Sequence, residues 1–305
     1  MEIISLTKKL VRKMMPAREA GTAKWDFGRL LVVAGHITMP GAAALCAAAA
    51  TRSGVGLVRL ASVKDVCNSL AAHLTPCTLL ITPQCPQGGI AAEALSVVLG
   101  EANACVATVF GPGMGRGEDA RALMSGLVAG CRTPMVIDAD GLNLLAETSK
   151  RVCAQKGPVI LTPHVVEFSR LTGLTVETIR QNPCLHASQY AQQKGVTVVL
   201  KGADTVIAGP NGPVYLHSRD NNGLAKGGSG DVLAGLMGGL LAQLSAGSGP
   251  VDAQACMRAA CCAVWLHGQA GWHAFQYFGP YAMNASDLIN TLPMAFKDLL
   301  DEAGE

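Results

Sequence analysis

The feature that most constrains the fold is a repeated alternation of short apolar runs with helical patterns. Four segments begin with an apolar run, continue through Gly, Pro or Asp, and then show helical periodicity: residues 29–54, 106–130, 134–145 and 158–173. Such runs are typical of strands buried in a parallel sheet, and parallel strands need helical crossovers between them. The pattern therefore predicts an α/β protein with a doubly wound, mostly parallel sheet and helices on both faces. Aromatic residues make up 4% of the chain while Ala and Gly abound, which favours close packing of helices on a sheet.

One region departs from this alternation. Residues 196–217, VTVVLKGADTVIAGPNGPVYLH, hold strand-like runs joined by the turn sequence GPNG, which predicts an antiparallel hairpin at an edge of the sheet. No long Ser/Pro/Gly linker divides the chain. We therefore expect one domain over residues 21–305, preceded by an N-terminal extension over residues 1–20, with the first strand near Arg29.

Composition excludes several classes of function. A formal net charge of +2 lacks the basic excess of nucleic-acid binding proteins. The N-terminal segment has no apolar stretch of the secretory kind, and the most apolar stretches, 40–50 and 232–244, are shorter than a membrane span. We expect a cytoplasmic protein that binds neither membrane nor nucleic acid. The 11 cysteines show no metal-binding spacing, so we expect small, buried, reduced side chains.

The segment NNGLAKGGSGD, residues 221–231, places glycines and a lone carboxylate, Asp231, directly before a helical pattern. Glycines let backbone N–H groups approach a ligand closely, and the first turn of a helix attracts anions. A phosphate site is one interpretation of this loop. A helix cap is the other, because Asp is favoured in the first turn of any helix. The loop alone leaves the two interpretations level.

Four other loops carry polar or glycine-rich sequences at predicted strand ends. GPGMGRG (111–117) matches neither the Walker pattern nor G-x-G-x-x-G, and fits a tight turn as well. TPHVVEF (162–168) puts His164 and Glu167 on one helix face, either as site residues or as a cap. DADGLN (138–143) suits a ribose, a hydrated Mg²⁺ or a turn, and LKGADT (200–205) offers Lys201. In doubly wound sheets these loops converge on one cleft.

Taken in order, the motifs resemble one family. FGRLLVVAG, MPGAAALCAAAATRSGVGLV, FGPGMGRG, VIDADGLNLL, VILTPHVVEF, VVLKGADTVIA and GLAKGGSGDVLAGLMGGLLAQ, over roughly residues 22 to 300, resemble the ADP/ATP-dependent NAD(P)H-hydrate dehydratases of the ribokinase-like superfamily. The resemblance implies a three-layer α/β/α sandwich with a mostly parallel central sheet. It also implies a repair activity, in which ADP or ATP drives dehydration of the S form of NADHX or NADPHX back to NADH or NADPH. With ADP the products include AMP and phosphate, and Mg²⁺ is the expected metal.

The resemblance also implies roles for individual residues. Asp231 would be the base that acts on the hydrate's hydroxyl, with Gly227 to Gly230 as the anion hole for the transferred phosphate and Lys226 at its start. Glu167 would position Mg²⁺ through water. The expected adenine-nucleotide site comprises Lys201, Gly202, Ala203, Asp204, Thr205, Gly228, Ser229 and Gly230. The expected hydrate site comprises Ala42, Gly113, His164 and Asp231.

The sequence departs from the family pattern in two loops. Relatives commonly read P-H-P-G-E where this chain has Pro163-His164-Val165-Val166-Glu167, and they have Thr where it has Ser229. With about 25 residues before the expected first strand, we expect no fused epimerase domain. The resemblance further implies a homotetramer.

Other functions stay open on sequence grounds. The nearest alternative is a kinase of the same superfamily that acts on a thiazole, pyrimidine or sugar and keeps Asp231 and the anion hole. A nucleotide-binding regulator without catalysis is a second alternative. A dinucleotide-dependent oxidoreductase is disfavoured, because no G-x-G-x-x-G follows the first predicted strand.

Overall fold

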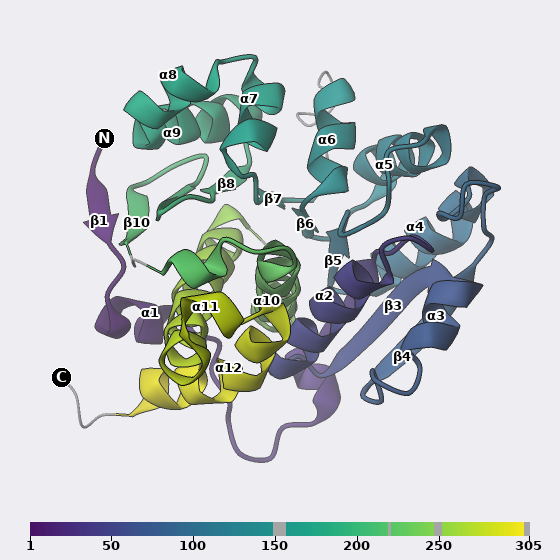
Figure 1. Cartoon of the computed structure of the whole chain (residues 1–305), viewed down its shortest axis with the longest axis horizontal. Helices are drawn as coiled ribbons and strands as arrows, with labels where there is room; N and C mark the ends of the chain where they lie inside the picture. Colours follow the sequence, from purple (N-terminus) through teal and green to yellow (C-terminus); the bar gives the residue numbers. More distant parts are fainter. Residues whose placement is uncertain (149–156, 219–220, 247–251, 302–305) are drawn as a thin grey trace.

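The computed structural model describes residues 1–148, 157–218, 221–246 and 252–301, and these ranges form a ten-stranded sheet between two layers of helices (Figure 1). The strands lie in the order β1-β10-β9-β8-β7-β6-β5-β2-β3-β4. Their bounds are β1 (Ile3–Ser5), β2 (Arg29–Val33), β3 (Leu57–Val63), β4 (Cys77–Thr82), β5 (Ala107–Phe110), β6 (Met135–Ile137), β7 (Val159–Leu161), β8 (Thr197–Leu200), β9 (Asp204–Ala208) and β10 (Val214–Ser218).

The pairing confirms the predicted sheet. Every neighbouring pair is parallel except β8 with β9 and β9 with β10. The sequence GPNG lies between β9 and β10, as the hairpin prediction required. Strands β2 and β5 are buried along nearly their whole length, which accounts for their continuous apolar runs.

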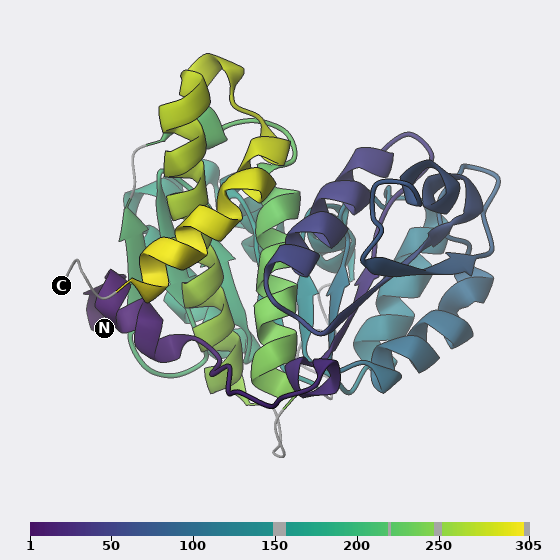
Figure 2. The same ribbon diagram turned by 90° about the horizontal axis from the view of Figure 1, so that it is seen from below.

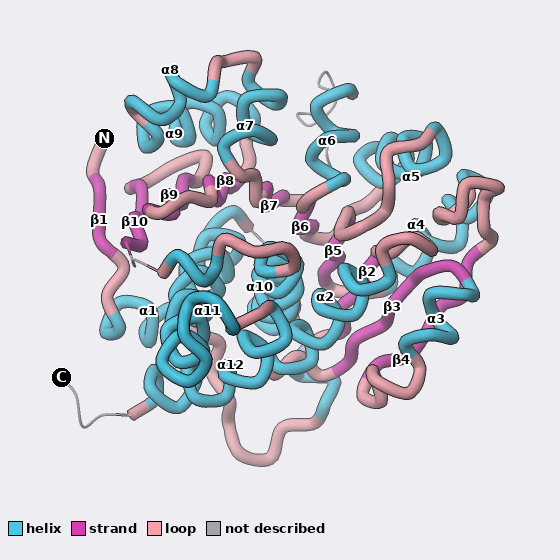
Figure 3. Tube along the Cα trace, in the orientation of Figure 1, coloured by secondary structure: helices cyan, strands magenta, loops and turns pink. Residues whose placement is uncertain are grey.

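Helices cover both faces of the sheet, as Figure 3 shows in the two cyan layers on either side of the magenta strands. One layer holds α2 (Pro40–Arg52), α3 (Lys64–Leu70), α10 (Ser229–Ser245) and α11 (Ala253–Ala282), with α1 (Lys8–Met14) and α12 (Ala285–Leu300) packed on it. The other holds α4 (Leu95–Ala104), α5 (Glu118–Gly130), α6 (Asp140–Glu147), α7 (Val165–Thr172), α8 (Val176–Gln181) and α9 (Pro183–Lys194). Short 3-10 turns are η1 (Lys24–Phe27), η2 (Ala92–Ala94) and η4 (Asn222–Leu224). The three-layer α/β/α arrangement is therefore present.

Helix α10 is the central helix of its layer, and its glycines allow it to pack closely. A Cβ on Gly235 would lie 2.0 Å from the carbonyl oxygen of Cys46 in α2, and one on Gly238 would lie 2.2 Å from Cγ2 of Val109 in β5. Larger residues there would force α10 away from both neighbours. The glycine-rich sequence of α10 therefore fixes where its N-terminus, and with it Asp231, meets the sheet.

The N-terminal residues contradict one expectation. The first strand is β1 and not the strand at Arg29, and β1 pairs in parallel with β10 (Figure 1). Because β1 pairs with β10, β1 is the edge strand of the sheet and the hairpin of β9 and β10 lies one strand further in. In α1 the side chain of Val11 is fully buried, and Arg258 of α11 donates to the carbonyl oxygens of Met14 and Met15. Figure 2 shows α1 against the helical layer that contains α11 and α12. Three strand residues are too few to give a periodic signal.

The cysteine expectation is confirmed where the structure describes it. Ten cysteines are free thiols, eight of them buried and two half-buried, while Cys153 lies outside the described residues. None of the helices in the described ranges combines the length and apolar character that a membrane span requires.

Candidate active site

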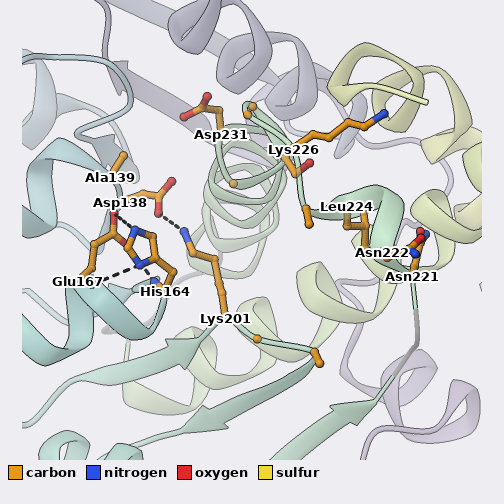
Figure 4. Close-up of a pocket in the computed structure, with 17 residues that line it drawn as sticks. Asp138, Ala139, His164, Glu167, Lys201, Asn221, Asn222, Leu224, Lys226 and Asp231 are labelled. Carbon is orange, nitrogen blue, oxygen red and sulfur yellow. Dashed lines mark hydrogen bonds and ion pairs between the residues drawn. The ribbon is translucent and has the colours of Figure 1, made fainter. Parts of the chain in front are cut away.

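A cavity of about 790 Å³ opens at the carboxyl end of the central strands, beside the N-terminus of α10 (Figure 4). Four of the predicted loops meet there, namely those after β6, β7 and β8 and the glycine loop before α10. The lining residues are Asp138, Ala139, His164, Glu167, Lys201, Gly202, Ala203, Asn221, Asn222, Leu224, Ala225, Lys226, Gly227, Gly228, Ser229, Gly230 and Asp231.

Four predicted site residues lie outside this lining. Asp204 and Thr205 begin β9 and pair with Ser218 and His217 of β10. Ala42 and Gly113 lie against each other, since a Cβ on Gly113 would be 2.7 Å from Cβ of Ala42. The contact joins the loop after β5 to the start of α2. The roles expected of these four residues stay predictions.

The N-terminus of α10 presents unpaired amides to the cavity. Gly228 precedes the helix with φ 93°, a left-handed conformation that favours glycine, and a Cβ there would lie 2.6 Å from Leu45. Val232 donates to the carbonyl of Gly228, while the amides of Ser229, Gly230 and Asp231 have no acceptor in the described chain. These amides and the helix dipole are suited to binding an anion.

Asp231 does not cap α10. No side chain makes a capping hydrogen bond at this helix, and the Asp231 carboxyl has no hydrogen-bond partner within the described ranges. Burial raises the pKa of Asp231 to about 7, with further increases from the charges of Asp138 and Asp140, while Lys201 lowers it. A carboxyl group with that pKa can accept a proton near neutral pH. The geometry therefore disfavours the capping interpretation and leaves the general-base interpretation standing.

Asp138 and Lys201 form a buried ion pair on the sheet side of the cavity (Figure 4). Oδ1 of Asp138 accepts from Nζ of Lys201 at 2.8 Å and from Oγ1 of Thr162 at 2.7 Å. Burial lowers the pKa of Lys201, but the charges of Asp138, Glu167 and Asp231 outweigh it and raise that pKa above its usual value. Lys201 therefore keeps its positive charge, which suits it to bind a phosphate. Asp138 belongs to the segment DADGLN, for which the sequence left a ribose site, a hydrated Mg²⁺ site and a simple turn open.

The turn that carries Asp138 is strained. Ala139 has φ 51°, and no other non-glycine residue with positive φ occurs in the described ranges. Such a conformation costs about 1–3 kcal/mol and is concentrated at functional sites. It places Asp138 in the cavity while Asp140, the first residue of α6, accepts from the amide of Gly115 at 2.9 Å.

His164 and Glu167 form a capping box at the start of α7. The Nδ1 atom of His164 accepts from the amides of Val166 and Glu167, and Oε2 of Glu167 accepts from the amide of His164 at 2.8 Å. Burial, with help from Lys201, lowers the pKa of His164, so the ring is neutral and its proton lies on Nε2, 3.4 Å from Oε1 of Glu167. Burial also raises the pKa of Glu167 to about 7. The two residues therefore cap α7 and also line the cavity, and the site roles expected of them stay predictions.

Lys226 contradicts its expected place in the anion hole. Its Nζ donates at 2.6 Å to the carbonyl oxygens of Tyr281 and Met283, and in Figure 4 the side chain extends away from Asp231 and Lys201. Those carbonyls lie beyond Gly279, where φ is 69° and the helical path breaks. Lys226 therefore fastens the glycine loop to the α11–α12 junction instead of binding phosphate with its ammonium.

Several residues in or beside the cavity escaped sequence reasoning. Asn221, Asn222 and Leu224 line the cavity from η4, although they belong to the quoted segment NNGLAKGGSGD. His267 lies behind the anion site on α11, with Nε2 3.0 Å from the carbonyl oxygen of Ser229. Burial lowers its pKa to about 4, so it is neutral. No motif marks His267, because its contact joins segments far apart in the chain.

The described residues contain no cluster of three or more His, Cys, Asp or Glu side chains arranged to hold a metal ion. The carboxylates around the cavity fit a hydrated Mg²⁺ better than a directly bound ion. Oδ1 of Asp138 is taken by Thr162 and Lys201, and both oxygens of Glu167 face His164. Mg²⁺ usually keeps several waters and takes one or two carboxylates plus substrate phosphates.

The sequence matches the NAD(P)H-hydrate dehydratase family over residues 30–294. It is 37% identical to a bifunctional NAD(P)H-hydrate repair enzyme of Moorella thermoacetica over 97% of this chain and 54% of that protein. It is 33% identical to the ADP-dependent (S)-NAD(P)H-hydrate dehydratase of Bacillus subtilis over 95% of this chain and 97% of that protein. The chain spans about half the length of the bifunctional relatives that it matches.

Comparison with solved structures agrees with the sequence matches. The ADP/ATP-dependent NAD(P)H-hydrate dehydratase of Bacillus subtilis, co-crystallized with ATP and Mg²⁺, superposes with a TM-score of 0.80 at 30% identity, covering 98% of this chain and 99% of that one. A hydroxyethylthiazole kinase of Pyrococcus horikoshii shares the fold alone, with a TM-score of 0.57 at 15% identity over 93% of this chain and 90% of that one. On the sequence match and the shared fold, the chain belongs to the NAD(P)H-hydrate dehydratase family.

Proposed function

We propose that this protein dehydrates (6S)-NADHX and (6S)-NADPHX to NADH and NADPH with ADP as co-substrate, giving AMP and phosphate. One observation carries the proposal. Asp231 lies in the first turn of a helix whose free amides form an anion site, and its side chain makes no capping hydrogen bond. Its pKa is about 7. That pairing of a base with a phosphate cradle is what transfer of a phosphoryl group to a hydroxyl requires.

The chemistry explains why a dehydratase would use a kinase-like site. Hydroxide is a poor leaving group, so the hydrate's hydroxyl must first be activated. Asp231 accepts the hydroxyl proton, the oxygen attacks the terminal phosphorus of ADP, and the bond to AMP breaks. The carbon–oxygen bond of the phosphorylated hydrate then breaks, phosphate leaves, a ring proton is lost, and the ring double bond re-forms.

Each wall of the cavity has a part in this proposal. The segment from Lys201 to Ala203 and η4 hold the adenine nucleotide, with the ammonium of Lys201 near its phosphates. The amides of Ser229 and Gly230 stabilise the negative charge on the phosphoryl group during its transfer. Glu167 and Asp138 would hold Mg²⁺ through water, and the ion would neutralise phosphate charge.

The test is an assay of NADHX with ADP, and separately with ATP, in which the absorbance of reduced nicotinamide returns. Recovery that depends on nucleotide, with AMP formed from ADP in equal amount, supports the proposal. No recovery with either nucleotide overturns it, and a stable phosphorylated product would indicate a kinase instead. Asp231→Asn is the matched control, because it keeps the shape of the side chain and removes the base.

We also propose that the protein is a homotetramer, on the resemblance to its family. Light scattering on the purified full chain measures this directly, and a monomeric mass would contradict it.

A further inference from the structure

The side chain of His267 contacts the first turn of α10 from outside the cavity. His267 belongs to α11, and its Nε2 atom lies 3.0 Å from the carbonyl oxygen of Ser229. A carbonyl oxygen can only accept, so Nε2 carries the ring proton and donates it. Ser229 lines the cavity, whereas His267 does not. The histidine therefore reaches the backbone of the cavity wall without facing a bound ligand.

The carbonyl that accepts from His267 shares a peptide group with an amide of the anion site. The carbonyl of Ser229 and the N–H of Gly230 are the two ends of one planar trans peptide, so they point in opposite directions. The N–H is one of the free amides that the first turn of α10 presents to the cavity. A donor fixed on the carbonyl therefore fixes the direction in which the Gly230 N–H points.

The same hydrogen bond strengthens the Gly230 amide as a donor. A hydrogen bond at the carbonyl end polarises the whole peptide, and linked hydrogen bonds reinforce one another. The carbonyl has two lone pairs, so the bond from His267 adds to the helical ladder without replacing it. Burial lowers the pKa of His267 to about 4, so the donor is a neutral imidazole. Removing it takes away a hydrogen bond and no charge.

Neighbouring residues of α11 fit closely against the same part of the fold. A Cβ on Gly268 would lie 2.4 Å from Nε2 of His217 in β10, and one on Gly271 would lie 2.9 Å from Cδ2 of Leu224 in η4, which lines the cavity. Gly271 lies one helical turn after His267, on the same face of α11. This close packing leaves the helix little freedom to move away from α10.

We propose that His267 is a positioning residue for phosphoryl transfer: by holding the carbonyl of Ser229, it directs the amide of Gly230 at the phosphoryl group in the transition state. The inference rests on the proposed function, because it names the residue that supports the anion site of that reaction. A donor fixed in place beforehand needs no reorganisation as charge develops, so its benefit falls on kcat and not on ADP binding.

The test replaces His267 with one residue that keeps the donor and one that removes it. In His267→Gln the side-chain amide nitrogen can take the place of Nε2, whereas His267→Leu fills a similar volume without a donor. We expect His267→Leu to lower kcat about tenfold while KM for ADP stays within about threefold of wild type, and His267→Gln to keep most of the wild-type kcat. Equal losses in the two variants, or a wild-type kcat in His267→Leu, would overturn the proposal.

His273→Leu is the matched control. It breaks another Nε2 hydrogen bond of α11, the one of 2.7 Å to Asp298 in α12, and neither residue lines the cavity. This variant should keep the wild-type kcat. A tenfold loss here as well would mean that any broken contact of α11 lowers turnover, which would contradict a specific role for His267.

A spectroscopic measurement reads the hydrogen bond itself. Labelling with ¹³C-carbonyl serine and ¹⁵N-glycine confines the signals to Ser–Gly peptides, and Gly230→Ala identifies the one at the start of α10. We expect the carbonyl carbon signal of Ser229 to move upfield in His267→Leu and to stay near its wild-type position in His267→Gln. An unmoved signal in His267→Leu would overturn the proposal.

Circular dichroism establishes that each variant is folded. If His267→Leu does not fold, His267→Asn takes its place, because its amide is one carbon shorter than that of Gln and stops short of Ser229; equal kcat in the Asn and Gln variants would then overturn the proposal. Wild-type turnover of NADHX with ADP tests the proposed function separately. Without that turnover the proposed function fails, and this role with it; with it, variants that do not separate as stated contradict the role of His267 alone.

Discussion

The ammonium of Lys201 lies 2.8 Å from Oδ1 of Asp138, whose side chain is 1% exposed, and this pair sets the electrostatics of the cavity. The two residues come from different strand ends, those of β8 and β6, and act on Asp231 with opposite sign. Asp138 raises the pKa of Asp231 and Lys201 lowers it. The protonation state of the candidate base is therefore set first by its burial and then by charges that make no hydrogen bond to it.

The activity should depend on pH with an acid limb near 7. A general base must be deprotonated, and the pKa of Asp231 is about 7. We expect kcat/KM to fall about tenfold per pH unit below that value. Glu167 has a similar pKa, so Glu167→Gln is the control: the acid limb should persist in that variant. A flat profile between about pH 5 and 8 would contradict a role for Asp231 as base.

The acid limb of the pH profile should shift in opposite directions when Asp138 or Lys201 is replaced. Asp138→Asn removes a negative charge, so the pKa of Asp231 and the acid limb should fall. Lys201→Met removes a positive charge, so both should rise. Measuring kcat/KM against pH for the two variants checks this, and shifts of the same sign would exclude electrostatic control by the pair.

Asp138→Asn should also lower the free energy of unfolding by about 2 kcal/mol, because it leaves Lys201 incompletely paired.

Asp231→Asn should abolish turnover and stabilise the fold at neutral pH. In the folded protein the pKa of Asp231 is about 7, far above that of an unfolded aspartate, so the wild type loses stability as pH rises between those values. Asn cannot ionise and escapes that loss. We expect the variant to gain up to about 4 kcal/mol at pH 8 and less than half of that at pH 5, measured by urea unfolding. An equal gain at both pH values would mean that Asp231 does not titrate as described.

The strand and loop pattern was predictable because it is local. Buried parallel strands such as β2 and β5 read as continuous apolar runs, and the turn between β9 and β10 has its own signature. The loops were predicted to converge because the carboxyl ends of parallel strands meet at one edge. The fold class, the hairpin and the Asp231 cavity followed from those two facts.

The failures concern contacts across the fold. Strand β1 has three residues and gains its place from pairing with β10, which no local pattern encodes. Lys226 was assigned to phosphate because it precedes the glycines, yet its ammonium is held by carbonyls more than fifty residues later. His267 shows no motif at all. Long-range hydrogen bonds of this kind follow from packing, not from spacing in the sequence.

The anion site should respond differently to two glycine substitutions. A Cβ on Gly230 would lie 3.3 Å from Nζ of Lys201 and 3.7 Å from Oδ2 of Asp138, in the space expected for phosphate, whereas one on Gly227 would meet nothing within 4 Å. Gly230→Ala should therefore lower kcat/KM about tenfold to a hundredfold while leaving stability within about 1 kcal/mol, since Ala is the better helix former. Gly227→Ala is the matched control and should keep near-normal kcat/KM; an equal loss in both would argue against a phosphate at Gly230.

Lys226 should support nucleotide binding without touching the nucleotide. Its two hydrogen bonds, to the carbonyls of Tyr281 and Met283, fasten the loop that leads to Gly228 and the free amides of α10. In Lys226→Met these bonds are lost, so we expect unfolding free energy to fall by about 1 kcal/mol and KM for ADP to rise severalfold, because binding must then order the loop. Lys64→Met, at an exposed lysine of α3, controls for loss of charge. If the ammonium bound phosphate directly, kcat would also fall and salt would weaken ADP binding less in the variant than in wild type; unchanged kcat with raised KM supports the fastening role.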